Sequence, residues 1–77
     1  MNIKVKLFGE LADIAGRHEL TLNDVQDIQS LRNKFSEAFP AASGKQFLIA
    51  LNRKVVHHNP ALDAADEVAF MPPFSGG

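Results

Sequence analysis

The 77-residue chain contains no cysteine, and this absence removes several kinds of chemistry at once. Without a thiol the protein forms no disulfide, builds no zinc site from thiolates and has no cysteine nucleophile. The sequence also lacks a glycine-rich phosphate-binding loop, and its serines stand in no convincing arrangement with a histidine and a carboxylate. We therefore do not expect the chain to be an enzyme by itself.

An excess of one charge and long apolar runs are missing as well. Lysine and arginine total 8 and aspartate and glutamate total 9, so the chain lacks the basic stripe with which proteins neutralise nucleic-acid phosphates. No window approaches the roughly 20 apolar residues of a membrane span, and the first residues include no apolar core of signal-peptide length. We expect a cytoplasmic protein that binds neither nucleic acid nor a membrane.

The apolar pattern predicts five short strands. A chain of this length is one domain, close to the lower size limit for a stable core without cross-links. Apolar and polar residues alternate in the first two segments, as in half-buried strands, whereas the third is apolar throughout, which favours a strand covered on both faces. The expected strands are residues 2–7, 17–22, 47–51, 54–56 and 67–71.

Two helices are expected between these strands. A short one lies within residues 8–16, where Gly16 is a natural residue just past a helix end. The main helix begins after Asp27, a good N-cap, and ends at Phe39-Pro40, because the residue before proline avoids helical geometry. Ser30 takes the place of the Glu or Gln of a capping box.

The apolar positions of the main helix step by three and four residues; they are Ile28, Leu31, Phe35 and Ala38. The order of the elements predicts an α+β fold of the ubiquitin-like β-grasp type, with a mixed sheet packed on one main helix and the last strand near the centre. Leu62 is expected to plug the core, and His18, on the face of Leu20, to be structural.

The end of the chain carries the predicted reacting group. Pro72 and Pro73 lack amide donors and hold φ near about −65°, so the last strand cannot continue through them. Residues 72–77 reach up to about 20 Å when extended. Gly76 and Gly77 have no Cβ, so nothing blocks attack at the last carbonyl. We expect a domain at 1–71 and a functional tail at 72–77, with the terminal carboxylate of Gly77 as its reactive group.

Exposed aromatic residues and histidines give two further expectations. Phe8, Met71 and Phe74 are predicted to form an apolar patch at the tail root where a partner docks. The alternative is that Phe8 belongs to the core, because a small domain needs its aromatics for burial. His57 and His58 are adjacent and point to opposite faces of an extended chain, so we expect an exposed loop and no metal site.

This ending resembles that of the small, ubiquitin-like subunit of molybdopterin synthase, in the MoaD/ThiS sulfur-carrier family. The family commonly closes with an apolar strand, Pro-Pro, two variable residues and Gly-Gly. The likeness covers most of the chain and is also seen at residues 8–16, 28–32, 50–53 and 66–70. Two positions depart from the family pattern. Ala65 stands where glycine is common, which is expected to strain the turn, and Met71 stands where an aromatic is common.

The resemblance implies a sulfur carrier for molybdenum-cofactor biosynthesis. An ionised carboxylate, with a pKa of about 3.3–3.7, repels nucleophiles and needs activation. A ubiquitin-activating-like adenylyltransferase would consume ATP to form the glycyl adenylate of Gly77, and sulfur would displace AMP to leave a thiocarboxylate. No cofactor would be bound by the carrier itself. Sulfur would be held on the backbone end and on no side chain.

The tail would then enter a channel in the large, catalytic subunit of the synthase, within a heterotetramer. The segment inserted in this way comprises Pro72, Pro73, Phe74, Ser75 and Gly76. Acid and base groups would belong to that partner.

Three alternatives stay open. A thiamin-type sulfur carrier shares the fold and the Gly-Gly end but usually lacks the proline pair. A ubiquitin-like protein modifier would use Gly77 for an isopeptide bond to lysine, and its covalent conjugates would distinguish it from a carrier. A plain interaction module would have a passive tail, and loss of Gly77 would then change nothing.

Overall fold

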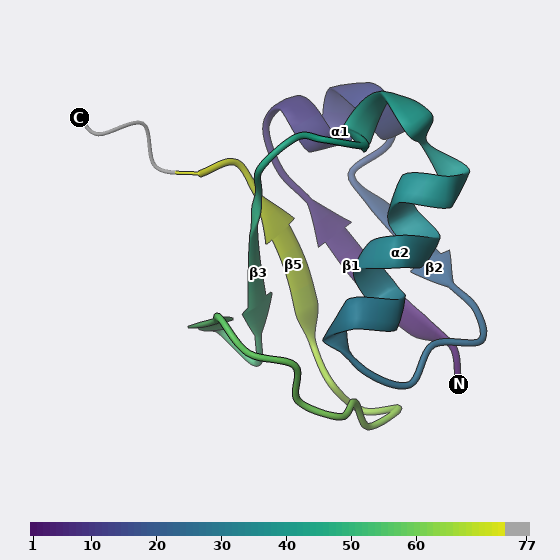
Figure 1. Ribbon diagram of the computed structural model, residues 1–77, viewed down its shortest axis with the longest axis vertical. Coiled ribbons are helices and arrows are strands. Elements are labelled where there is room, and N and C mark those ends of the chain that lie inside the picture. Colours follow the sequence, from purple (N-terminus) through teal and green to yellow (C-terminus); the bar gives the residue numbers. More distant parts are fainter. Residues whose placement is uncertain (74–77) are drawn as a thin grey trace.

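The computed structural model describes residues 1–73 and shows a mixed sheet curved around one main helix (Figure 1). The strands are β1 (Ile3–Leu7), β2 (Glu19–Leu22), β3 (Leu48–Leu51), β4 (Lys54–Val56) and β5 (Val68–Met71). The helices are α1 (Glu10–Ala15), α2 (Ile28–Ala38) and the 3₁₀ helix η1 (Pro40–Ala42). The strand order is β2-β1-β5-β3-β4, with β5 parallel to β1 and antiparallel to β3. The predicted β-grasp with a central last strand is therefore confirmed.

Helix α2 begins where its capping signal predicts. The Asp27 carboxylate accepts a hydrogen bond from the Ser30 amide at 2.8 Å, and the Asp27 amide donates to the Ser30 hydroxyl at 3.1 Å. This reciprocal pair is a capping box in which serine replaces the usual Glu or Gln. At the other end, the Phe39 amide donates to the Phe35 carbonyl at 2.9 Å. Both predicted ends of the helix are confirmed.

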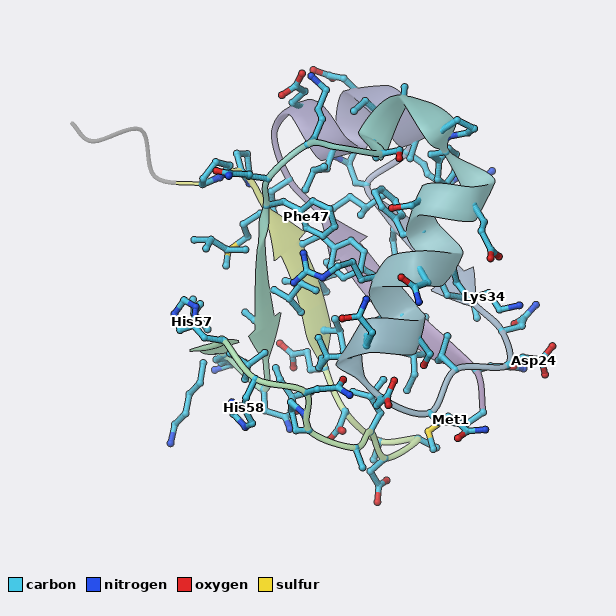
Figure 2. All side chains as sticks on the ribbon, in the orientation of Figure 1. Met1, Asp24, Lys34, Phe47, His57 and His58 are labelled. Atoms are coloured by element: carbon cyan, nitrogen blue, oxygen red, sulfur yellow. The ribbon has the colours of Figure 1, made fainter. Side chains whose placement is uncertain are left out.

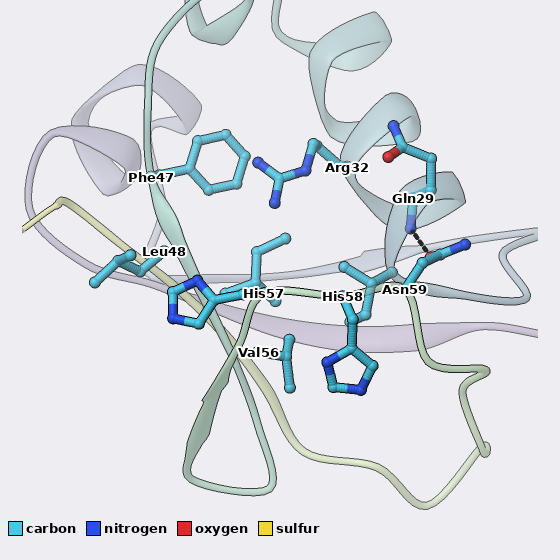
Figure 3. A pocket seen from close by; sticks show the side chains of 10 residues that line it. Gln29, Arg32, Phe47, Leu48, Val56, His57, His58 and Asn59 are labelled. Carbon is cyan, nitrogen blue, oxygen red and sulfur yellow. Dashed lines mark hydrogen bonds between the residues drawn. The ribbon is translucent and has the colours of Figure 1, made fainter.

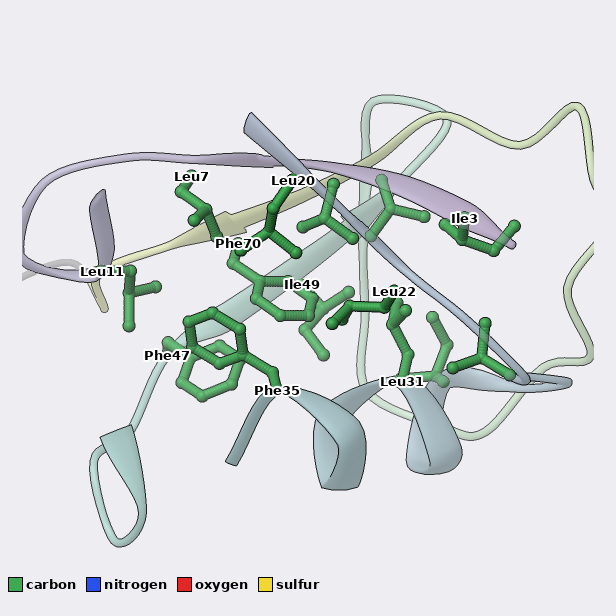
Figure 4. Close-up of a cluster of buried hydrophobic side chains, with 14 of the residues drawn as sticks. Ile3, Leu7, Leu11, Leu20, Leu22, Leu31, Phe35, Phe47, Ile49 and Phe70 are labelled. Carbon is green, nitrogen blue, oxygen red and sulfur yellow. The ribbon is translucent and has the colours of Figure 1, made fainter. Parts of the chain in front are cut away.

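The core fills the space between α2 and the sheet (Figure 4). Phe35 of α2 packs edge to face against Phe70 of β5 with ring centroids 5.0 Å apart, and it also contacts Phe47 and Phe39. Pairs in such geometry add about 0.5–1.5 kcal/mol beyond the area that they bury. Leu62 is buried in the same cluster, as predicted.

Two residues were placed on the wrong face by the sequence pattern. Ala38 is exposed because the step from Phe35 carries it to the margin of the apolar stripe at 3.6 residues per turn. His18 is also exposed, because β2 begins only at Glu19 and His18 lies in the turn before it. Its carbonyl nevertheless accepts a hydrogen bond from the Leu7 amide at 2.9 Å.

Strand β3 differs from its prediction as well. Helix α2 covers only one face of the sheet, and the other face of β3 carries Leu48, which is partly exposed, and Ala50. Ala50 is buried by its cross-strand neighbours Val55 and Ala69 and not by a second layer. An apolar run therefore did not indicate two covered faces here. Within residues 1–73, no helix has the length and apolar character needed to cross a membrane.

Candidate functional site

The root of the tail is held on both sides by the sheet. The last register pairs of β5 are Leu7 with Phe70 and Leu48 with Met71, and the Phe8 amide adds a hydrogen bond to the Phe70 carbonyl at 3.1 Å. Pro72 and Pro73 follow directly and are exposed. The central position of β5 thus gives the segment after Met71 a rigid starting point. The predicted residues Phe74, Ser75, Gly76 and Gly77 lie outside the described part of the chain.

An apolar patch lies beside this root, on the face of the sheet that α2 does not cover. Phe8 is 48% exposed, so the alternative that places it in the core is wrong. A shallow cavity of about 290 Å³ lies among the side chains of this face. We define the open-face patch as the residues that line this cavity: Lys6, Phe8, Ala50, Arg53, Val55, Glu67, Ala69 and Met71. Phe8 and Met71 both line this cavity, and the docking role predicted for them together with Phe74 stays a prediction.

Sequence reasoning missed the other three apolar members of the open-face patch. Ala50, Val55 and Ala69 come from β3, β4 and β5 and meet in one cross-strand row. Their small or branched apolar side chains give the patch an apolar centre, while charged groups stand at its margin. The Arg53 and Glu67 side chains are 3.6 Å apart there and both exposed, so this ion pair contributes little to stability. An apolar centre with a charged rim is the arrangement found at protein–protein contacts.

The turn before β5 is fixed by Asn52 in the β3–β4 turn. Asn52 has φ 51°, and its side chain donates to Asp66 at 3.0 Å and accepts from the Glu67 amide at 2.9 Å. The Asn52 side-chain hydrogen bond, followed by one from the Asp63 amide, holds the pKa of the Asp66 carboxyl below its usual range. Ala65 has no positive φ, so the strain expected from the missing glycine is not found. These contacts fix where the strand that leads to the tail begins.

Gly9 also meets the tail root, and sequence reasoning gave it no role. It lies in the turn between β1 and α1 with φ 58° and ψ −135°. A Cβ placed on it would come within 2.5 Å of the Pro72 ring. The sequence shows only a glycine between a predicted strand and a predicted helix, and this pattern occurs in many loops that have no such contact.

A second cavity, of about 360 Å³, lies between α2 and the β3–β4 hairpin (Figure 3). The Arg32 guanidinium stands over the Phe47 ring there, 5.1 Å from its centroid. His57 and His58 line the rim and are exposed, as predicted (Figure 2). In the described residues, no three histidine or carboxylate side chains gather in a way that would hold a metal ion. The cavity shares no residue with the open-face patch.

The chain is similar to known proteins of one family. The sequence profile of the ThiS family matches residues 5–77. The chain is 37% identical to a molybdopterin synthase sulfur carrier subunit of Chlamydomonas reinhardtii over the full length of both, and 31% identical to one of Caenorhabditis briggsae, with 100% and 99% of the two chains covered. It is also similar to the solved small archaeal modifier protein 1 of Methanosarcina acetivorans, at 26% identity and a TM-score of 0.80, covering 99% of this chain and 96% of that one. The chain belongs to the ThiS family.

Proposed function

We propose that this chain is the sulfur carrier subunit of a molybdopterin synthase and donates sulfur from a thiocarboxylate formed on Gly77. One observation carries the proposal: the central strand β5 ends at Met71 between two neighbours, and an exposed proline pair follows beside an apolar patch. This arrangement fixes the root of a tail next to a surface on which a partner can dock. The relatives at 37% and 31% identity, named as sulfur carrier subunits, support the same activity.

Activation begins at the carboxylate of Gly77. One carboxylate oxygen attacks the α-phosphorus of ATP, pyrophosphate leaves, and the glycyl carbon is bound as a mixed anhydride with AMP. A sulfur nucleophile at the oxidation level of sulfide then attacks this carbon and expels AMP, which leaves the thiocarboxylate. The adenylate makes this attack possible because its acyl carbon no longer belongs to a carboxylate anion, which would repel the nucleophile, and because AMP can leave from it. An adenylyltransferase of the ubiquitin-activating type supplies the catalytic groups.

Sulfur transfer takes place in the large subunit. The tail enters its active site, and the thiocarboxylate sulfur attacks a carbon of the pterin precursor and displaces an oxygen leaving group from it. Water then hydrolyses the acyl–sulfur bond, which leaves a thiolate on the pterin and returns the carboxylate of Gly77. Holding the two reactants in one geometry contributes several kcal/mol to such a step, with effective molarities of about 10⁵ M or more. The open-face patch is the docking surface in this proposal, and Phe8 and Met71 place it directly at the tail root.

A second candidate is a ubiquitin-like protein modifier. The similarity to a small archaeal modifier protein, at 26% identity, favours it. The same glycyl adenylate would then pass to a lysine amine and form an isopeptide bond. Free thiocarboxylate on the carrier supports the first proposal, and lysine conjugates in cell extracts support the second.

The test alters the length of the chain at Gly77. One residue added after Gly77 moves the carboxylate by about 3.5 Å, whereas a displacement of about 1 Å can already cost 10²-fold in rate. We expect both the extended chain and the chain without Gly77 to lose ATP–pyrophosphate exchange and sulfur transfer. Gly76→Val keeps the carboxylate but adds a branched side chain, which a narrow channel would reject. We expect it to lose mainly the transfer step.

The matched control is one residue added before Met1. The N-terminus lies at the opposite end of the domain from the tail root, so this variant should keep full activity (Figure 1). If the chain extended past Gly77 still forms the adenylate and still delivers sulfur, the terminal-carboxylate mechanism is wrong.

A further inference from the structure

Gly9 has a backbone conformation that side chains disfavour. With φ 58° and ψ −135° it lies in a region that residues other than glycine occupy only under strain. The turn is tied to its surroundings on both sides. The Gly9 carbonyl accepts hydrogen bonds from the Ala12 and Asp13 amides of α1 at 3.1 and 3.3 Å, and the preceding Phe8 amide bonds to Phe70 of β5. Gly9 therefore cannot shift without moving α1 or β5.

The space where a side chain of Gly9 would lie is filled by the tail root. An added Cβ would be 2.5 Å from Cγ and 3.3 Å from Cδ of Pro72. Gly16 and Gly44 also have positive φ, 73° and 84°, yet an added Cβ would meet nothing within 4 Å at either position. The positive φ alone would explain why glycine stands at each of these three positions. Only at Gly9 would an added Cβ also meet another residue, Pro72.

We propose that Gly9 is a positioning residue for the tail. Because Gly9 has no side chain, the Pro72 ring can lie directly against it, and this contact fixes where the chain leaves the domain relative to the open-face patch. Proline has no N–H to donate, so Pro72 cannot add a ladder hydrogen bond of its own to β1 or β3. Contact with Gly9 holds it instead. Phe8 belongs to the patch and adjoins Gly9, so a single turn fixes the position of the tail root relative to the proposed docking surface.

This role rests on the proposed sulfur transfer and follows from its geometry. When the domain is docked and the tail is extended into a partner, the chain has no slack to absorb a shift at its root. A Cβ on residue 9 would push the Pro72 ring away by about 1 Å to reach ordinary contact distance. Such a displacement is enough to cost about 10²-fold in a positioned reaction.

The experiment compares Gly9→Ala with Gly16→Ala in the full chain. Both carriers are prepared with a chemically installed thiocarboxylate, which removes the activation step, and are mixed with the large subunit of molybdopterin synthase. Gly9→Ala should lower the transfer rate at saturating carrier by about 10- to 100-fold while its Kd for the large subunit changes less than about threefold. Gly16 lies in the left-handed helical region (φ 73°, ψ 20°), where alanine is less strained than at Gly9, and its added Cβ meets no atom, so both quantities should stay within about twofold of the parent.

A double variant separates the clash from the strain. Pro72→Ala removes Cγ and Cδ, the two atoms that a Cβ on residue 9 would approach more closely than ordinary contact, so Gly9→Ala/Pro72→Ala should recover to the transfer rate of Pro72→Ala alone. If Gly9→Ala unfolds the domain, Pro72→Ala provides the test, because it adds no strain at residue 9. It should lower the transfer rate by several-fold with an unchanged Kd.

Three outcomes overturn the proposal. They are sulfur transfer by Gly9→Ala as fast as by Gly16→Ala, a double variant no faster than Gly9→Ala alone, and full transfer by Pro72→Ala. A parent thiocarboxylate that delivers no sulfur refutes the proposed function as well, so failure of the activity and failure of the positioning role are distinguishable.

Discussion

The two faces of the sheet are built from the same strands and carry different residues. On β1 and β5, the side chains that face α2 are at most 1% exposed and entirely apolar. Their direct neighbours along the strands point the other way and are lysines, alanine or the partly exposed Met71. Because side chains alternate with a period of two, each strand serves both faces at every second residue. If the open-face patch is the docking surface that we propose, stability and docking depend on alternate positions of the same strands.

Phe70 and Met71 show this difference between neighbours. Phe70 is fully buried and its ring packs against Phe35 and Phe47, whereas Met71 lines the open-face patch. Changes on the covered face should act through folding, and changes on the open face should act through binding. The predictions below test whether the two effects separate.

The largest effect is expected for Phe35→Ala on the covered face. Phe35 is fully buried and touches three other aromatic rings, and truncation of such a residue costs about 3–5 kcal/mol. A domain of this size has about 5 kcal/mol or little more to lose, so the variant should be largely unfolded. Urea denaturation followed by circular dichroism measures the loss. Glu37→Ala, exposed on the same helix, should change stability by less than about 0.5 kcal/mol.

A loss below about 1 kcal/mol for Phe35→Ala would contradict the role given to the aromatic cluster, since even a poorly packed core position costs more than that.

A smaller effect on stability but a clear one on binding is expected for Phe8→Asp. The side chain is 48% exposed, so a carboxylate there stays in water in the free domain and the fold should be kept. In a complex it would be buried without a partner, and loss of a central aromatic contact costs about 2 kcal/mol or more. The Kd for the large subunit, measured by calorimetry, should rise by at least about tenfold. Thr21→Asp, on the same face but in the outer strand β2, is the control.

Equal weakening by Thr21→Asp would show that added charge acts at long range, and an unchanged Kd for Phe8→Asp would show that the open-face patch is not the docking surface.

The fold was predictable because its signals are local. Alternation, the three-and-four spacing of α2, the Asp27 cap and the Phe39-Pro40 end each depend on neighbouring residues and need no knowledge of the rest of the chain. Apart from Ala38, at the margin of the apolar stripe of α2, the errors arose where a signal depends on partners far along the sequence. The alternation that included His18 does not say where pairing with β1 begins. The apolar run of β3 does not say that only one face is covered.

The candidate site was predictable only at its root. Pro72 and its neighbour Met71 stand out in the sequence, and Phe8 was linked to them as an exposed aromatic. Val55 and Ala50 joined the patch only through the strand order, which places β4 beside β3 and β3 beside β5. The contact of Gly9 with Pro72 joins two turns far apart in sequence, and no local pattern announces it.

The smallest effect is expected on acidification, and it tests whether stability rests on the cap of α2 and the start of β5. The Ser30 backbone amide is the largest cause of the lowered pKa of the Asp27 carboxyl, and the Asn52 side chain is the largest cause for Asp66. A lowered pKa in the folded state means that the unfolded chain binds the proton more readily. This stabilisation is fully present above the unfolded pKa of about 3.9 and is lost as the pH falls through the folded pKa values.

Urea midpoints measured at several pH values check this expectation. They should be insensitive to these two groups between about pH 5 and 8 and should fall below about pH 4. Asp27→Asn keeps a good N-cap but removes the titrating group, so its midpoint should depend less steeply on pH below 4. Asp66→Asn should act in the same direction. Asp13→Asn, whose side chain is exposed and accepts no hydrogen bond from residues 1–73, should keep the parent slope. If both variants stay as acid-sensitive as the parent, carboxylates other than the helix cap and the β5 turn govern acid unfolding.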